Sequence, residues 1–209
     1  MVEQLIELNR DAPNEDWLTQ YRNFMPTGMP HFVGLEAEAT SISAYHPTVV
    51  YGLLQTEAYA KALFEVQRPV EDTTAEFIQR NVELRMERKR RVLARTDPVK
   101  LRVVLGEASL RIPVGDDNVM REQYGEIIRL AKEDHVSIQV LPFRRGYRSS
   151  NDFTILDLGS CPPECRLTTR GVPFRPRTHD VRSIGSPVGS TRWWAWPSVS
   201  KPPSIFWKN

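Results

Sequence analysis

The chain has 209 residues, of which 40% are hydrophobic and 26% are charged, a balance that suits a globular protein with its own core. No apolar run approaches the roughly 20 residues of a membrane span, and the N-terminus lacks the basic-then-apolar order of a secretory signal. We therefore expect a cytoplasmic protein with no membrane segment.

Charge is divided unevenly along the chain. Residues 1–159 carry 20 lysines and arginines against 24 aspartates and glutamates, a net charge of −4, whereas residues 160–209 carry 8 against 2, a net charge of +6. Residues 1–159, called the body below, are acidic and lack the excess positive charge that binds nucleic acid. We therefore expect no direct DNA contact from them.

The N-terminal part of the chain predicts helices separated by a loop. Short helices are expected over residues 3–11 and 13–24, before a loop at 25–30 that contains two prolines and a glycine. Residues 31–42 are a helix candidate with apolar side chains along one side, at Phe32, Leu35 and Ala39.

The most distinctive segment of the sequence, VVYGLLQTEAYA, predicts a strand, a turn and a helix. Residues 42–54 are rich in β-branched and aromatic side chains, and Gly52 permits a tight turn after them. Thr56 is expected to cap a helix over 57–67, which Pro69 should end.

A second long helix is expected to begin at TTAE, where Thr73 and Glu76 form a capping box, and to run to about Arg95. It contains RMERKRR, residues 85–91, the most basic run of the body. Phosphate binding is one interpretation of this run. We favour a solvated helix face, because Glu83 and Glu87 are placed to pair with Arg90, Arg91 and their neighbours.

The rest of the body predicts strands and helices in alternation. A strand and a short turn or helix are expected over 100–110, a helix over 115–134 with Asp116 and Asp117 at its positive end, and strands over 136–143 and 152–158. Helices first, then strands and helices interleaved, predict an α+β fold in which several helices pack on a small mixed sheet.

Common catalytic and metal-binding templates are absent from the sequence, which has no GxGxxG, Walker A, HExxH or GxSxG motif. Its four histidines are scattered. Cys161 and Cys165 have only His179 nearby, and zinc needs four ligands. We predict no catalytic residues, no metal and no cofactor.

The candidates for binding a ligand or partner are the turn glycine and the polar residues expected near the strand–turn–helix junction: Glu36, Gly52, Gln55, Thr56 and Tyr59. The alternative is that these groups only satisfy backbone partners. A small-metabolite enzyme built on the same cluster is a further alternative, although Glu36 and Glu38 do not share a helix face and make a poor acid–base pair.

Several stretches of the body resemble one family in register: FVGLEAEATSISAYHPTVVYGLLQTEAYAKAL, RMERKRRVLARTDPVKLRVVLGEASLRIPVG, VMREQ, VSIQVLPFRRG and DFTILDL. They resemble the domain that follows an Xre-type helix-turn-helix in many actinobacterial regulators of the Scr-type, antitoxin-like class, domain of unknown function 5753. The resemblance covers about residues 3–158. Where the family usually has proline before GLLQT, this chain has Tyr51.

The resemblance implies that residues 1–159 are the ligand- or partner-sensing domain of a cytoplasmic Xre-family transcription regulator. It implies as partner a small protein encoded by a neighbouring gene, or a small-molecule ligand. DNA would be bound only through an N-terminal helix-turn-helix that this chain lacks, since MVEQLIELNRDA resembles the linker after that motif. A stand-alone antitoxin-like interaction protein is the alternative.

Residues 160–209 are expected to form a non-globular tail, because they hold eight prolines and four of the five tryptophans with little apolar periodicity. We interpret the tail as an out-of-frame reading of the family's normal C-terminus. Read two bases late with GC-rich codons, residues 192–209 can encode an alanine- and leucine-rich amphipathic helix. The alternative is a genuine Pro/Arg/Trp-rich tail that binds a partner or a membrane surface.

Overall fold

A computed structural model of the chain describes residues 16–26, 28–71, 73–146, 148–159 and 167–170, with the backbone alone at 16, 69–71 and 167–170. All of these residues lie in one compact unit. Its elements are α2 (Asp16–Thr19), η1 (Arg22–Phe24), α3 (Met29–Glu38), β1 (Ser41–His46), η2 (Gly52–Leu54), α4 (Glu57–Glu71), α5 (Ala75–Leu93), β2 (Lys100–Gly106), α6 (Glu107–Arg111), α7 (Asp117–Leu130), β3 (Val136–Leu141), η3 (Phe143–Arg145), β4 (Phe153–Asp157) and β5 (Leu167–Arg170).

The strands form one mixed sheet in the order β3-β2-β1-β4-β5. β1, β2 and β3 run parallel, with Ser43 opposite Arg102 and Arg102 opposite Ser137. β4 lies antiparallel to β1, and β5 lies antiparallel to β4. The predicted fold class, several helices on a small mixed sheet, is confirmed.

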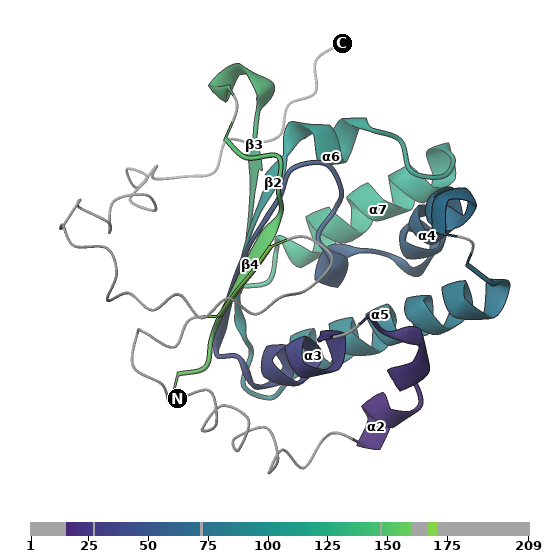
Figure 1. The fold of residues 1–209 in the computed structure, drawn as a ribbon. Coiled ribbons are helices and arrows are strands. Elements are labelled where there is room, and N and C mark those ends of the chain that lie inside the picture. The colour runs from purple at the N-terminus through teal and green to yellow at the C-terminus, as the bar shows by residue number, and fades with distance from the viewer. Residues whose placement is uncertain (1–15, 27, 72, 147, 160–166, 171–209) are drawn as a thin grey trace, which may run out of the picture. The chain divides into compact units, whose positions relative to one another are not determined.

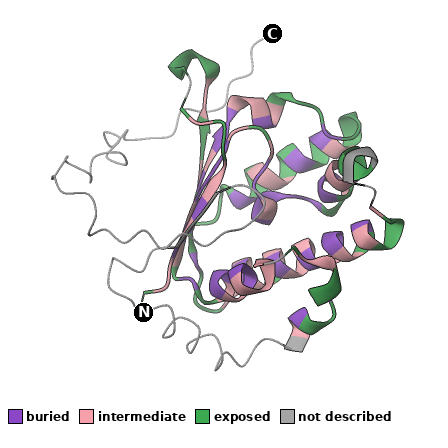
Figure 2. Cartoon of the chain, viewed as in Figure 1, coloured by how far each residue is buried: buried purple, intermediate pink, exposed green. Residues whose placement is uncertain are grey.

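The labelled helices gather on one face of the sheet (Figure 1). This arrangement follows from the alternation of side chains along a strand, which places every second residue on the same face. In β2, Leu101, Val103 and Leu105 are buried, whereas Lys100 and Arg102 are exposed. The helices on this face carry buried residues too, which are purple in Figure 2.

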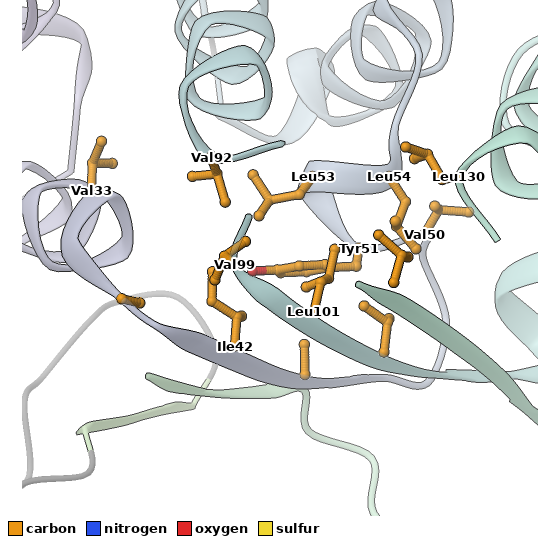
Figure 3. Packing of buried hydrophobic residues seen from close by; sticks show 14 of the residues in the cluster. Val33, Ile42, Val50, Tyr51, Leu53, Leu54, Val92, Val99, Leu101 and Leu130 are labelled. Atoms are coloured by element: carbon orange, nitrogen blue, oxygen red, sulfur yellow. The ribbon is translucent and has the colours of Figure 1, made fainter. Parts of the chain in front are cut away.

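The core lies between this sheet face and the helices, and the segment around η2 crosses it (Figure 3). Leu53 and Leu54 of η2 are fully buried, and Tyr51, just before η2, is 4% exposed. Burial of side chains this large removes apolar area from water, which is the main favourable contribution to folding. The junction is therefore fixed by packing on both sides.

Several predicted elements are confirmed in detail. Phe32, Leu35 and Ala39 are all buried at α3 or its end. Asp116 caps α7, because its carboxylate accepts hydrogen bonds from the backbone N–H groups of Asn118 and Val119.

Several predicted helix boundaries were wrong. The helix expected over 31–42 begins inside the predicted loop and ends earlier, at Met29–Glu38, and β1 begins at Ser41. Thr74, one residue after the predicted Thr73, caps α5 by accepting from the N–H of Phe77 at 3.1 Å. α4 also continues to Glu71, past Pro69, which was expected to end it.

The sheet extends beyond residue 159, because β5 lies within the segment predicted as a tail. The remainder of that segment, including CPPEC and the four tryptophans, lies outside the described residues. Where the structure is described, no helix has the length and apolar content to cross a membrane.

Candidate functional site

Helix α5 turns three cationic side chains inward rather than presenting them to solvent. The side chain of Arg88 is 7% exposed, that of Lys89 is 15% exposed, and Arg85 is half-buried. The predicted solvated face was wrong for these three residues. It is right for the outer pairs, because Glu87 binds Arg90 at 2.7 Å and Arg91 at 2.6 Å.

The deepest of these contacts joins α5 to α3. Arg88 donates from Nε to Oε2 of Glu36 at 2.9 Å and from Nη2 to Oε1 at 3.0 Å, and the Glu36 carboxylate is fully buried. The guanidinium carbon of Arg88 lies 5.5 Å from the centroid of the Phe32 ring. This is the bidentate geometry that makes arginine–carboxylate pairs strong and directional.

Tyr51 completes this buried group. Its hydroxyl donates to Oε1 of Glu36 at 3.2 Å. Burial, and next the negative charge of Glu36, raise the pKa of Tyr51 well above its ordinary value, so the phenol remains a neutral donor. Tyr51 therefore contributes both a buried core side chain and a hydrogen bond to Glu36.

Gln55 lies at the second inward contact of α5, where η2 meets α4. Its Nε2 donates to the carbonyl of Val50 at 2.7 Å, and its Oε1 accepts from Nη1 of Arg85 at 2.6 Å. Lys89 donates to the backbone carbonyl of Gln55 at 2.8 Å and to Glu126 of α7 at 2.6 Å. Gln55 is thus held by its backbone and by both ends of its amide.

Thr56 and Tyr59 face backbone groups. Thr56 Oγ1 accepts from the N–H of Tyr59 at 3.2 Å, which confirms it as the cap of α4. Its own N–H donates to Oε1 of buried Gln123, whose Nε2 donates to the carbonyl of Leu54. The Tyr59 hydroxyl accepts from the N–H of Val50 at 3.3 Å.

Gly52 was predicted for its conformational freedom, yet its backbone φ is not among the positive values of the chain. A Cβ built on Gly52 would meet only one neighbouring atom, Nε of Arg85, at 4.0 Å. What the glycine provides is space beside the Arg85 guanidinium. Gly52 and Gln55 therefore lie together at Arg85, whereas Glu36 is committed to Arg88 and Tyr51.

His46, at the end of β1, is a polar residue that the sequence did not single out. It is 9% exposed, and neither ring nitrogen has a hydrogen-bond partner. The Asp152 carboxylate lies 3.8 Å from Nδ1, and the Tyr51 ring centroid is 4.9 Å away. Burial lowers the pKa of His46 to about 4, so the imidazole is neutral at pH 7.

Most of the charged groups in this cluster are paired with one another. The carboxylate of Glu36 is saturated by Arg88 and Tyr51, and the Lys89 ammonium is paired with Glu126. Within the described part of the chain, no group of three histidine, cysteine, aspartate or glutamate side chains could hold a metal ion. The signal that could have found the inward cations is the i, i+3, i+4 spacing of Arg85, Arg88 and Lys89 on one helix face.

Two surface cavities lie away from the five predicted residues. One, of about 370 Å³, is lined by Arg95, Lys100 and Arg102 at the amino ends of β1 and β2. The other, of about 420 Å³, lies between α5 and α7 with Met86, Leu93 and Leu130 among its lining residues.

Comparison with known proteins gives one family. The family model described as "Domain of unknown function (DUF5753)" matches residues 29–178, which is more than half of the chain and includes β5. No curated protein and no solved structure matches the chain. The chain belongs to the DUF5753 family.

Proposed function

We propose that this domain is the ligand- or partner-sensing part of a cytoplasmic Xre-type transcription regulator, and that DNA is contacted by a separate helix-turn-helix. The proposal rests on the resemblance of the sequence motifs and on the acidic charge of residues 1–159. A sensing domain must couple a binding event to the arrangement of its elements.

The observation that carries the proposal is the way three cations of α5 tie it to four other elements: α3, η2, α4 and α7. Arg88 holds α3 through Glu36, Arg85 holds the η2–α4 junction through Gln55, and Lys89 holds both Gln55 and α7. A ligand that contacts any of these groups would bias the packing of α5 against all four elements. Because Glu36 is already saturated, the cluster is better suited to recognition than to acid–base catalysis.

A reporter assay tests this function. The 209-residue chain is fused after a helix-turn-helix whose operator is known, and repression is measured with and without extracts of small metabolites. We expect repression to change with effector, and to stop changing when Gln55→Ala loosens the junction. The isolated chain should show no specific gel shift, and tight specific binding to operator DNA by the chain alone would contradict the proposal.

The α5–α7 cavity favours a second candidate function, an antitoxin-like interaction protein. Its lining combines apolar side chains, such as Met86 and Leu93, with the ion pair of Arg129 and Glu133, as protein interfaces do. Co-purification with the product of a small neighbouring gene would support this function. A neighbouring-gene product that does not bind at micromolar concentration would remove it.

A further inference from the structure

Arg85 differs from the other inward-facing cations because its charge is not balanced. Arg88 is paired with Glu36 and Lys89 with Glu126. Among the described residues, no carboxylate forms an ion pair with Arg85, and its one hydrogen bond goes to the neutral amide of Gln55. Burial, and next the charge of Arg88, lower the pKa of Arg85 to about 10, so it is still a cation at pH 7.

The Arg85 side chain is held in place before any ligand arrives. The Phe64 ring centroid lies 4.6 Å from its guanidinium carbon, and Gln55 accepts from Nη1 at 2.6 Å. Gln55 cannot rotate freely, because its amide nitrogen donates to the Val50 carbonyl at 2.7 Å. An arginine fixed in this way loses little side-chain entropy on binding, which favours affinity.

The space beside Arg85 lies at Gly52. A Cβ at Gly52 would meet Nε of Arg85 and nothing else within 4 Å, although the backbone there does not require glycine. Nη1 is committed to Gln55, so the Nε–Nη2 edge of the guanidinium remains as a pair of parallel donors. That edge has the geometry to bind a planar acceptor with two oxygens.

We propose that the Nε–Nη2 edge of Arg85 binds the carboxylate of a small organic acid, in the space that Gly52 leaves open. The charge of the cluster selects this class of ligand. Glu36 balances the charge of Arg88, and Glu126 with Glu133 balances Lys89 with Arg129. The single positive charge of Arg85 remains, which matches a monoanion. A phosphate dianion would be only half neutralised by this single charge.

The regulatory meaning of this site rests on the proposed sensing function, whereas binding itself does not. A carboxylate on Arg85 would sit on the same side chain that holds Gln55 and hence the η2–α4 junction. The ligand would thereby stabilise the arrangement of η2 and α4 against α5, by as much as its affinity for that arrangement exceeds its affinity for others.

The test uses NMR titration of the ¹⁵N-labelled 209-residue chain, observing the arginine Nε–H signals. Sodium acetate is the probe, with sodium chloride at equal ionic strength as the reference and inorganic phosphate as a second arm. We expect a saturable shift of the Arg85 Nε–H signal with acetate. No saturable shift, or a shift with phosphate and none with acetate, would overturn the proposal.

Three variants assign the binding to this edge. Gly52→Ala adds a methyl group at an ordinary contact distance, so the melting temperature should be unchanged while acetate affinity falls roughly tenfold or more. Arg85→Lys keeps the charge, loses the fork, and should weaken binding by about the same factor. Arg90→Gln, on the exposed side of α5, is the matched control and should bind as the parent does.

The two proposals fail in different ways. If Gly52→Ala and Arg85→Lys bind acetate as well as the parent, the site is wrong, whatever the reporter does. If acetate binds as expected but no carboxylate changes repression in the reporter fusion, the site stands and the sensing function is wrong.

Discussion

Arg88 and Glu36 lie 52 residues apart in the sequence and share two hydrogen bonds, of 2.9 and 3.0 Å, in the middle of the core. Their side chains are 7% and 0% exposed. Removing two charges from water is expensive, and their mutual attraction offsets that cost only while both partners are present. The pair therefore restricts α3 and α5 to a packing in which both partners meet. Its net contribution to the free energy of folding is small.

Replacing one partner of this ion pair should destabilise the protein far more than replacing both. Glu36→Met leaves the Arg88 cation buried without a carboxylate, and we expect the free energy of unfolding to fall by about 3–5 kcal/mol. The double variant with Arg88→Met should recover most of this loss. Urea unfolding of the four chains measures the coupling. Glu87→Ala, which breaks only the outer pairs of α5, is the control, and a Glu36→Met chain as stable as that control would contradict the argument.

Gln123 should be a second sensitive position, because it satisfies two backbone groups at the η2–α4 junction. Its Oε1 accepts from the N–H of Thr56 at 2.9 Å and its Nε2 donates to the carbonyl of Leu54 at 2.8 Å. Gln123→Leu keeps the size of the side chain but leaves both backbone groups buried and unpaired. We therefore expect the free energy of unfolding to fall by about 2–5 kcal/mol. Gln79→Leu, on the exposed side of α5, should change stability little in the same denaturation assay.

The pH dependence of stability should carry the signature of His46. Burial depresses its folded pKa to about 4 from an ordinary 6.5, so between these values the unfolded chain binds a proton that the folded chain does not. Stability should be intact above pH 6.5 and fall as pH drops toward 4, by about 3 kcal/mol in total. The Glu126 contribution lies lower, because a hydrogen bond from Arg129 first, and then Lys89, holds its pKa at about 2.

Urea midpoints measured from pH 7.5 to 4.5 test this dependence. His46→Gln removes the buried ring and should flatten the curve between pH 6.5 and 4.5. His135→Gln, at a half-exposed position before β3, should leave the slope unchanged. A parent chain whose stability is constant over this window would contradict the assignment.

The features predictable from the sequence were those set by local periodicity. The apolar spacing of Phe32, Leu35 and Ala39 located one face of α3, and the threonine before EAYA located the cap of α4. Either of two adjacent threonines can cap a helix, so the local sequence could not decide between Thr73 and Thr74. Elements and their order follow from such patterns because each depends on neighbours in the sequence.

The partners across the fold could not be predicted in the same way. An arginine inside a run of charged residues is predicted to be exposed unless its buried partner is known. The partner of Arg88 is Glu36, 52 residues earlier, so no local pattern indicates the pair. Gly52 suggested a turn, and only the position of Arg85, 33 residues later, shows what space it leaves. The placement of β1 between β2 and β4 likewise depends on pairing between strands far apart in the sequence. No local pattern specifies which strands will pair.

Two glycines offer a matched test of packing. A Cβ on Gly106, at the end of β2, would lie 2.4 Å from the carbonyl oxygen of Pro47 and 2.9 Å from its Cα, so the backbone after β1 would have to move. A Cβ on Gly125, inside α7, would meet nothing within 4 Å. We expect Gly106→Ala to destabilise the protein by about 1–3 kcal/mol, since overpacking forces backbone shifts. Gly125→Ala should stabilise it by about 0.5–1 kcal/mol, because alanine loses less backbone entropy in a helix. Opposite shifts of the thermal midpoint would confirm both, and a Gly106→Ala chain as stable as the parent would show that Pro47 does not approach β2 this closely.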